Sequence, residues 1–564
     1  MLDKVIRVNM SVLAVAEEKL PAGYGKISGR ALTSRLVSDE VPATADPLGP
    51  RNKLVFACGL LAGTSLSSAQ RLSAGAKSPL TGGIKESNAG GVAAFRMARL
   101  GLRAIVLEGL PRDGRSYLLK VDKNGPMIEP AEDLAGLGVY EKASRLYSRY
   151  GGRVGLILIG PAGERRQLTA GITNNDPDGS PGRFCGRGGL GAVMGSKGVL
   201  AVVLDDTGAA PEKAARPEDF NRKVKQVAAW IREIPQTAEV FPKYGTAAML
   251  NNTNALGALP TRNFSTGTFE GAEKINGFAV HDTIAGRGGE GSTTHACMPG
   301  CLIRCSNIFP GRDGKALVSP LEYETIGLLG PNCGIDDLDV VARLNYLCND
   351  FGVDTIEVGC ALGVVMEAGI IPFGDAAGAL EAVEGIGGDT MLGRIIASGS
   401  VSAGKVFGIR RVPAVKGQGM PAYDPRGMKG LGVTYATSTM GADHTAGNTA
   451  RANVRHHLKE GQVRASRGAQ AGATLMDSLG LCIMLGAGLK DRNILAGLVS
   501  DRFGRETSLE ELQAVAGETL AIEKEFNRRA GITEAHDRLP EFFYDEVNPA
   551  CEAVFDLFDG DLEA

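Results

Sequence analysis

Short apolar runs that end at glycine-rich turns dominate the first 208 residues of the chain. Glycine accounts for 78 of 564 residues, about twice the usual share. The glycines lie beside Val, Leu and Ile in runs of strand length, such as KLVFACGLLAG, LRAIVLEG, YLLKV, VGLILIG and GVLAVVL. Glycine permits tight turns and close approach of the backbone to a ligand. The pattern predicts a sheet-based domain over residues 1–208 and hints at a large cofactor.

Beyond residue 208 the apolar side chains change to helical spacing. In PEDFNRKVKQVAAWIREI they recur at intervals of three and four residues, and similar stretches cover 339–368 and 508–529. No repeat with a period of 20–50 residues is visible, which argues against solenoids and propellers. We therefore expect an α+β fold, with a β-rich domain over 1–208 and mainly helical domains over 209–405 and 406–564.

Charge and hydropathy exclude several classes of function. The chain has 61 basic and 64 acidic residues, so a broad electrostatic footprint for nucleic acid is absent. No apolar run reaches the ~18 residues that would span a bilayer. The N-terminal apolar patch is followed by Glu17 and Glu18, without a twin-arginine pair or a cleavage site. We expect a cytoplasmic protein with no nucleic-acid or membrane partner, which binds small molecules and other proteins.

The strongest chemical signal is HACMPGCLIRC, in which three residues separate each pair among Cys297, Cys301 and Cys305. Three thiolates on one short loop can hold three corners of a 4Fe-4S cluster, whose fourth ligand then comes from elsewhere. Zinc is an alternative, although it usually has two residues between paired cysteines and a second pair. A radical-type cluster is another, although its second gap is usually shorter by one. Spacing favours a cluster over zinc.

Two similar polar segments, CNDFGVD and MDSLGLC, lie 128 residues apart. Each has a glycine for close approach and polar side chains for hydrogen bonds, which would suit two copies of one planar, polar ligand. The alternative is that they are two ordinary helix ends. Cys482 in the second segment is the candidate for the fourth cluster ligand. The matching positions are Asn349, Gly352 and Asp354 in the first segment, and Asp477, Gly480 and Cys482 in the second.

Eight motifs, in order along nearly the whole chain, resemble the tungsten-containing aldehyde:ferredoxin oxidoreductases. The resemblance implies a β-rich base under the cofactor and two helical domains that close over it. It implies a tungsten or molybdenum ion held by two molybdopterins, which a magnesium ion joins at their phosphates. The motifs are AKSPLTGG (76–83), IGPAGE (159–164), GRGGLGAVMGSK (186–197), EYETIGLLG (322–330), GVDTIEVG (352–359), VKG followed by PAYDPRG (415–427), YATSTMGADH (435–444) and DSLGLC (477–482).

The resemblance also implies which residues hold the cofactors. Arg71 would lie between the cluster and a pterin, where a cation stabilises the reduced cluster. Glycine-rich turns expose backbone N–H groups to phosphate, and arginine adds a forked charge. Pterin and phosphate contacts are implied for Asn88, Arg183, Gly186, Arg187, Asn349, Asp354, Asp477 and Leu481, although helix capping is an alternative for Asn349, Asp354 and Asp477. Cluster ligands are implied at Cys297, Cys301, Cys305 and Cys482.

For chemistry, the resemblance places Glu324 and His444 beside the metal. Oxidation of an aldehyde to an acid adds an oxygen from water and removes two electrons and two protons, which suits a carboxylate and an imidazole. We assign Glu324 to activation of water, and His444 to a hydrogen bond with the substrate carbonyl or the metal oxygen. Electrons would leave through the cluster to ferredoxin or a ferredoxin-like subunit, which implies an oligomer or a complex with a second subunit.

Two other functions are compatible with these residues. With the same cofactors the chain could reduce an aromatic acyl-CoA or a carboxylate at low potential within a larger complex. It could also be a non-enzymatic electron-transfer protein or a scaffold that holds iron-sulfur or zinc. Metal analysis separates the last possibility, because it predicts no tungsten, molybdenum or pterin.

Overall fold

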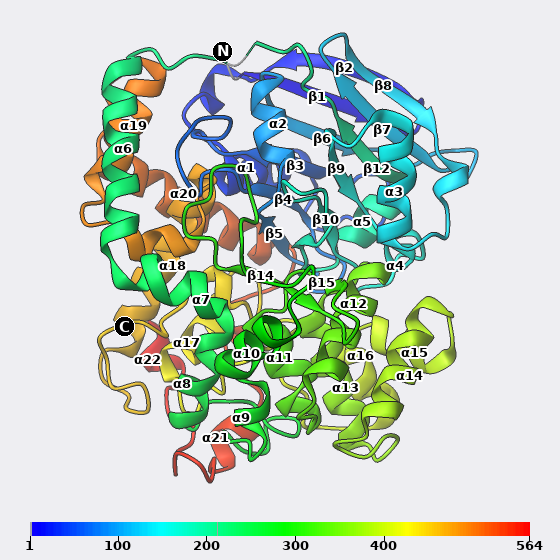
Figure 1. The fold of residues 1–564 in the computed structure, drawn as a ribbon, viewed down its shortest axis with the longest axis vertical. Coiled ribbons are helices and arrows are strands. Elements are labelled where there is room, and N and C mark those ends of the chain that lie inside the picture. Colours follow the sequence, from blue (N-terminus) through cyan, green and yellow to red (C-terminus); the bar gives the residue numbers. More distant parts are fainter. Residues whose placement is uncertain (1–2, 211, 564) are drawn as a thin grey trace.

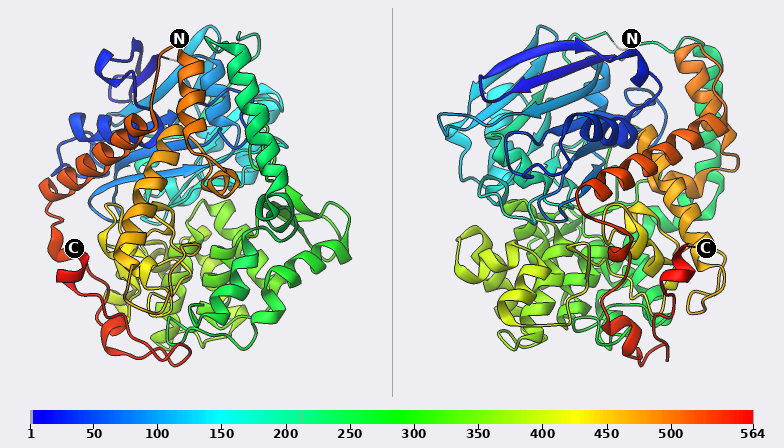
Figure 2. Two further views of the ribbon diagram at one scale, coloured as in Figure 1. Left: turned by 90° about the vertical axis from the view of Figure 1, so that its left-hand side faces the viewer. Right: turned by 180° about the vertical axis from the view of Figure 1, so that it is seen from behind.

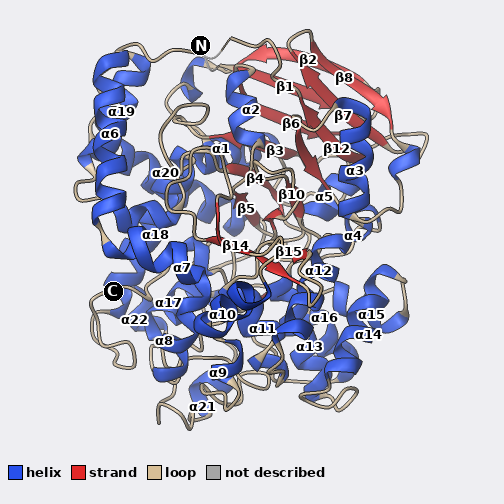
Figure 3. Cartoon of the chain, in the orientation of Figure 1, coloured by secondary structure: helices blue, strands red, loops and turns tan. Residues whose placement is uncertain are grey.

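Strands occupy the first third of the chain and helices most of the remainder, as Figures 1 and 3 show. The computed structural model describes residues 3–210 and 212–563. Two six-stranded sheets lie together at one end of the molecule, and the helices continue from there along one side and across the opposite end (Figure 1). This arrangement confirms the expected α+β class.

The two sheets have the same topology. The first has the order β2-β1-β6-β3-β4-β5 and the second β8-β7-β12-β9-β10-β11. Each sheet has one parallel pair, β1/β6 in the first sheet and β7/β12 in the second. All other pairs are antiparallel. The strands are β1 (Lys4–Asn9), β2 (Ala14–Lys19), β3 (Leu54–Cys58), β4 (Leu72–Lys77), β5 (Ile84–Ala89), β6 (Leu102–Glu108), β7 (Tyr117–Asp122), β8 (Gly125–Pro130), β9 (Gly155–Leu158), β10 (Ile172–Asn174), β11 (Arg183–Cys185) and β12 (Val199–Leu204).

The helices of this region repeat in the same order. In each half a longer helix follows the outer hairpin, and a shorter helix precedes the last strand. The region is therefore a structural duplication of about 100 residues per half, a longer period than that of solenoids. The longer helices are α1 (Gly29–Glu40) and α3 (Val139–Tyr150), the shorter are α2 (Ala93–Arg99) and α5 (Leu190–Ser196), and α4 (Pro161–Glu164) is an addition in the second half.

Helices make up most of the chain beyond residue 216. Three short strands, β13 (Ser292–His295), β14 (Ser306–Pro310) and β15 (Ala316–Val318), interrupt them, as does the hairpin of β16 (Ala414–Val415) and β17 (Gln418–Gly419). The helices are α6 (Pro217–Glu233), α7 (Phe241–Tyr244), α8 (Met249–Ala255), α9 (Ala272–Ile275), α10 (Gly277–Arg287), α11 (Tyr323–Leu329), α12 (Leu338–Phe351), α13 (Thr355–Glu367), α14 (Ala376–Gly387), α15 (Met391–Ala397), α16 (Ser400–Phe407), α17 (Lys429–Thr437), α18 (Gln462–Leu479), α19 (Asn493–Phe503), α20 (Leu509–Arg529), α21 (Phe542–Asp545) and α22 (Asp559–Glu563).

Local signals explain where several helices start and stop. The helical stretch predicted over 339–368 is two helices, because Gly352 ends α12 in the left-handed conformation and Asp354 caps α13. Ser508 and Glu511 form a capping box at the start of α20. Within 3–210 and 212–563, no helix has both the length and the apolarity needed to cross a bilayer.

The last long helix returns to the first sheet. α20 packs across α1, and Figure 2 shows it crossing the molecule behind the sheets. Buried Arg30 of α1 donates to Glu523 of α20 at 2.8 Å. The β-rich region and the C-terminal third are therefore joined by a charged contact as well as by apolar packing.

Candidate cofactor and active site

Two helix ends touch the duplicated base at glycines. α12 ends at Gly352 and α18 at Gly480, both with left-handed backbone. A Cβ at Gly160 would lie 2.2 Å from the carbonyl oxygen of Phe351, and a Cβ at Gly59 would lie 2.0 Å from that of Leu479. Because no side chain fits at these distances, glycine is required for both contacts.

The loops that follow these helices approach the base in equivalent ways. Gly171 N–H donates to Gly352 O at 2.9 Å, and Arg71 N–H donates to Gly480 O at 3.1 Å. Two residues further on, Asp354 N–H donates to Thr169 O at 2.9 Å and Cys482 N–H donates to Ser68 O at 2.8 Å. The two segments predicted from their shared spacing thus occupy matching places on the two halves of the base. They are also helix ends, as the alternative interpretation expects, and binding of a ligand at both places stays a prediction.

One polar group surrounds Asp477, near the end of α18. Asn88 Nδ2 donates to Asp477 at 3.1 Å, and Arg71 donates to the carbonyl oxygen of Asn88 at 2.9 Å. Arg30 lies 3.5 Å from the same carboxylate. Burial raises the pKa of Asp477 to about 6, although both arginines oppose the rise. Leu481 is buried directly after this turn.

A second polar group surrounds Asp354. Arg187 Nε donates to this carboxylate at 3.1 Å, while its terminal nitrogens donate to Ala442 O at 2.5 Å and Gly419 O at 2.6 Å. Gly186 packs beside it, since a Cβ there would lie 3.9 Å from Asp354 Oδ1. Arg187 therefore connects the base to two loops of the helical region, one at Gly419 and one at Ala442.

Two predicted pterin residues lie apart from these groups. Arg183 donates to Ser306 Oγ at 2.7 Å and to Ser319 Oγ at 3.0 Å, next to Asp176. Asn349 Nδ2 lies 3.5 Å from the hydroxyl of Tyr140. Among the described residues, neither side chain hydrogen-bonds another member of the predicted cofactor set.

The four predicted cluster cysteines gather in one buried cluster with Met298, Leu481 and neighbouring apolar residues. Ser68 links two of them, because its backbone oxygen accepts from Cys482 N–H and its Oγ lies 3.8 Å from Cys301 Sγ. The thiols of Cys297 and Cys301 influence each other, since their interaction raises the pKa of Cys297 and lowers that of Cys301. Arg71 lies on the inner side, where its charge counteracts the effect of burial on the pKa of Cys482.

The predicted catalytic residues come together from α11 and from the turn after residue 443. Glu324 Oε1 and His444 Nε2 are 3.4 Å apart, and Glu324 Oε2 accepts from Ala422 N–H at 2.8 Å. Burial raises the pKa of Glu324, and the nearby imidazole opposes the rise. The preceding Asp443 forms a buried ion pair with Lys85 of β5 at 2.5 Å, so the turn is fastened to the base.

Three tyrosines complete this region, and sequence reasoning did not assign them. The rings of Tyr323 and Tyr423 are 5.1 Å apart, and Tyr423 lies 6.2 Å from His444. The hydroxyl of Tyr435 is buried without a hydrogen-bond partner among the described residues. All three lie in or beside the quoted motifs, which was the available signal. The pairing of Lys85 with Asp443 spans 358 residues and has no local signal.

The described residues fit a polar ligand between the base and the helical region. Buried polar atoms are nearly always hydrogen-bonded. Here Thr169 Oγ1 beside Asp354, and Ser478 Oγ beside Asp477, have no partner among the described residues. The same holds for Glu324 Oε1 and His444 Nδ1. Unsatisfied groups at both equivalent helix ends suit a ligand with two similar polar halves.

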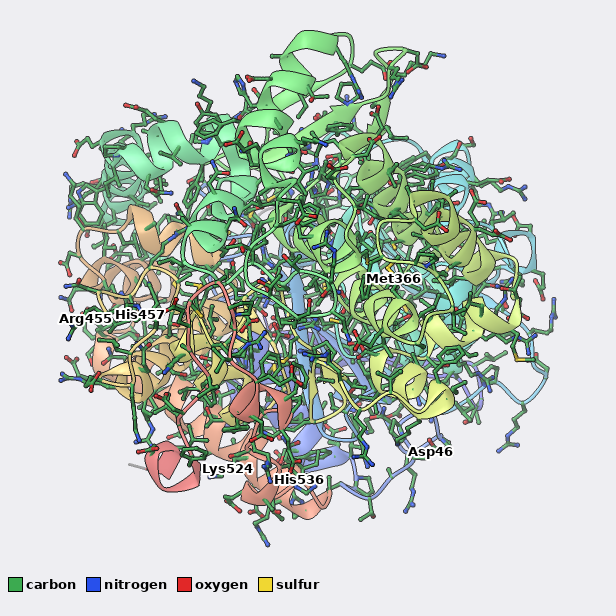
Figure 4. The ribbon with its side chains drawn as sticks, turned by 90° about the horizontal axis from the view of Figure 1, so that it is seen from below. Asp46, Met366, Arg455, His457, Lys524 and His536 are labelled. Carbon is green, nitrogen blue, oxygen red and sulfur yellow. The ribbon has the colours of Figure 1, made fainter. Side chains whose placement is uncertain are left out.

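Other histidines lie outside this region. Exposed His457 and His536 are at the periphery of the molecule in Figure 4. Buried His295 hydrogen-bonds Asp176 at 2.9 Å and precedes the cluster loop. Among the residues in 3–210 and 212–563, no three His, Cys, Asp or Glu side chains are close enough to hold a single metal ion.

Comparison with models of known protein families identifies the family of the chain. The model of the aldehyde ferredoxin oxidoreductase N-terminal domain matches residues 5–206, and the model of aldehyde ferredoxin oxidoreductase domains 2 and 3 matches residues 222–559. The chain belongs to the aldehyde ferredoxin oxidoreductase family. This confirms the resemblance seen in the motifs and makes the chain an oxidoreductase of that family.

Relatives of this family are similar over most of the chain. The tungsten-containing aldehyde ferredoxin oxidoreductase of Thermococcus kodakarensis is 32% identical, with 97% of this chain and 92% of the relative covered. The Pyrococcus furiosus protein of the same name is 31% identical with the same coverage. The solved active-site complex BamBC of benzoyl coenzyme A reductase, with 1,5-dienoyl-CoA, matches with a TM-score of 0.81 over 100% of this chain and 92% of that one. At 18% identity this likeness shows the fold alone.

Proposed function

We propose that this protein oxidises aldehydes to carboxylic acids at a tungsten or molybdenum bis-molybdopterin centre. Each turnover would combine one aldehyde with one water and release a carboxylic acid, two protons and two electrons. The electrons would pass singly through one 4Fe-4S cluster to ferredoxin or a ferredoxin-like subunit. The observation that carries the proposal is the partly buried pair of Glu324 and His444, 3.4 Å apart, each with a buried, unsatisfied atom.

The duplicated base supports the cofactor assignment. Two molybdopterins would lie against the two equivalent helix ends, with Asp354 and Arg187 on one side, and Asp477 and Asn88 on the other. Their phosphates and a magnesium ion would meet the glycine-rich turn at Gly186. When bound, the metal and its pterins would accept the two electrons of the oxidation. These roles rest on the matching contacts of residues 354 and 482 with the base.

The chain's own residues would move the proton and orient the substrate. Burial raises the pKa of Glu324, which makes its carboxylate a better acceptor for a proton from water. His444 would donate a hydrogen bond to the carbonyl oxygen, which increases the electrophilic character of the carbon. Tyr435 would supply a further hydrogen bond, because its buried hydroxyl has no partner among the described residues. The surrounding tyrosine rings would exclude bulk water.

The four cysteines support the relay. A cube needs its ligands spread over four corners, whereas one zinc ion needs them around a single point. The cluster would lie between Arg71, which faces the pterin side, and the protein surface. Two similar proteins are named as parts of larger assemblies. One is the WOR-like subunit of an aliphatic sulfonate oxidoreductase, which is 25% identical over 78% of this chain. The other is the BamBC complex. A separate electron carrier is proposed here for the same reason.

Reduction of an aromatic acyl-CoA is the second candidate. Only the fold likeness to BamBC favours it, whereas the relatives at 31–32% identity are named aldehyde oxidoreductases. We therefore place aldehyde oxidation first.

The test combines metal analysis with two assays on purified holoenzyme. We expect tungsten or molybdenum, molybdopterin, and about four irons per chain, the content of a single cube. We also expect reduction of a viologen dye by benzaldehyde or acetaldehyde. Dye-dependent reduction of benzoyl-CoA without aldehyde oxidation would favour the second candidate. Absence of both metals would refute both.

A further inference from the structure

The proposed cluster lies directly beneath one patch of the surface. Three of its four ligands have an exposed neighbour in the chain, namely Gly300 before Cys301, Arg304 before Cys305, and Ile483 after Cys482. Ile483 is a large apolar side chain with 39% of its surface exposed. Arg71 connects the cysteines to Asn88 on the proposed pterin side. We therefore take this patch, with its exposed neighbours, as the way out for an electron.

Three cations surround that patch. Lys243 lies in the last turn of α7, and a Cβ at Gly245, two residues later, would lie 2.7 Å from the carbonyl oxygen of Cys305. Arg451 stacks on Phe241 of α7 at 4.6 Å. Arg304 projects from the cysteine loop itself, with a left-handed backbone at φ 50°.

Few acidic side chains lie near these three cations. Arg451 also reaches Met484 Sδ at 3.8 Å, so it lies beside the turn that follows Cys482. Lys243, Arg304 and Arg451 are all exposed, and none forms an ion pair within the described part of the chain. Two acids lie near: Glu239, which is exposed two residues before α7, and partly exposed Glu322, whose charge acts on Cys305 and Cys482. The patch therefore carries net positive charge around an apolar side chain.

We infer that this face, formed by Lys243, Gly300, Arg304, Arg451 and Ile483, is the docking surface for a small acidic iron-sulfur protein that takes electrons one at a time. The inference rests on the proposed function and adds the place and the chemistry of the contact. Cations that surround an apolar centre attract an acidic partner and orient it, and this raises the association rate more than the lifetime of the complex. We call this surface the cluster face.

The test compares a protein acceptor with a small dye on the same holoenzyme. The probes are an acidic ferredoxin with two 4Fe-4S clusters and a viologen dye, which needs no docking surface. Lys243→Glu combined with Arg451→Glu should lower kcat/KM for ferredoxin about tenfold or more at low salt, mainly through KM. The rate with dye should stay within about twofold of the parent. Added salt should weaken the ferredoxin reaction of the parent and have less effect on the variant.

Lys405→Glu is the matched control. Lys405 is an exposed lysine of α16 that forms no ion pair with the residues described in 3–210 and 212–563, and Figure 1 places α16 on the other side of the helical region from α7. Equal loss of ferredoxin activity in Lys405→Glu and the double variant would overturn the inference. The loss would then depend on the net charge of the protein and not on the position of the substitution. If the double variant keeps the parent's ferredoxin kinetics and salt dependence, the cluster face is not the docking surface.

A measurement on the unaltered protein covers the case in which the variant misfolds. Lysine acetylation followed by mass spectrometry should show protection of Lys243, and none of Lys405, when ferredoxin is present. Equal labelling of Lys243 with and without ferredoxin would refute the cluster face. An enzyme that oxidises aldehydes with dye but shows no such protection refutes only the docking surface, whereas loss of metal and dye activity refutes the proposed function.

Discussion

Glu324 and His444 are held by different parts of the chain, and their surroundings determine what each can do. Glu324 keeps one oxygen on the backbone of Ala422 and leaves the other free toward His444. His444 follows Asp443, whose carboxylate is paired with Lys85 and has its pKa held far below the usual range by that ammonium and by Arg187. A fixed anion and an adjustable carboxylate thus lie on either side of the imidazole.

Glu324→Gln should lower kcat for aldehyde oxidation by about 10²- to 10⁴-fold, the range seen when a general base is lost. The amide keeps the hydrogen bond from Ala422 but cannot take a proton from water. Steady-state rates with dye, at matched metal and pterin content, measure the effect. Glu381→Gln, an exposed change on α14, is the control and should stay within a few-fold. Similar losses in both variants would remove Glu324 from the reaction.

The raised pKa of Glu324 determines the pH dependence. The proton acceptor works in its ionised form, so kcat/KM should fall as pH drops through the folded pKa. Because burial raises that pKa above the ordinary value near 4.5, the loss should begin at a higher pH than for an exposed glutamate. A pH profile with dye as acceptor measures it. If kcat/KM of Glu324→Gln falls at low pH in the same way as that of the parent, a group other than Glu324 causes the fall.

At the scale of elements, the ends of α12 and α18 bring the cofactor contacts to the base. Each end has a left-handed glycine, a polar side chain three residues before it, and a residue two positions after it that hydrogen-bonds the base. On one half that residue is Asp354 and on the other Cys482. One half of the duplication is thereby connected to the proposed cluster, and the other contributes no proposed cluster ligand at this position.

Gly59→Ala should disturb the half that carries Cys482. Its Cβ would lie 2.0 Å from the carbonyl oxygen of Leu479, so α18 must shift, at a cost of about 1–3 kcal/mol. Iron per chain and the thermal unfolding midpoint should both fall. Gly468→Ala in the same helix meets no atom within 4 Å and should stabilise the helix by up to about 1 kcal/mol. Equal iron content in the two variants would mean that this contact does not position the ligand.

Local patterns predicted the elements better than their arrangement. The apolar runs before Gly59 and Gly160 became buried strands, and the spacing in 217–233 became α6, because burial of a face leaves a short-range period. The duplication was not predicted, since β4 and β10 share a topology but not a sequence. Within the site, the cysteines and the pair of Glu324 and His444 were found through motifs. Arg30 was missed, because its partner Glu523 is 493 residues away.

At the scale of the whole molecule, the parts of the chain converge on one buried network. Glu523 of α20 accepts from Arg30 of α1, from Ser34 Oγ at 2.7 Å and from Thr439 Oγ1 at 2.7 Å. Thr439 belongs to the loop that leads to His444. The last long helix therefore contacts both the base and the catalytic turn. The expected domain boundaries near 208 and 405 remain predictions, but this contact crosses both.

Glu523→Gln should destabilise the protein by about 3–5 kcal/mol, because it leaves the buried guanidinium of Arg30 with only the more distant Asp477. Burial opposes the charge of Glu523, but Arg30 outweighs it and lowers the pKa of the carboxyl. This stabilisation is present above the unfolded pKa and is lost as pH falls through the folded pKa. The gap in thermal midpoint between the parent and the variant should therefore shrink in acid. Glu518→Gln, an exposed change on the same helix, should show no gap at either pH. If the difference in thermal midpoint between the parent and Glu523→Gln does not change with pH, the substitution acts through packing and not through the charge of Glu523.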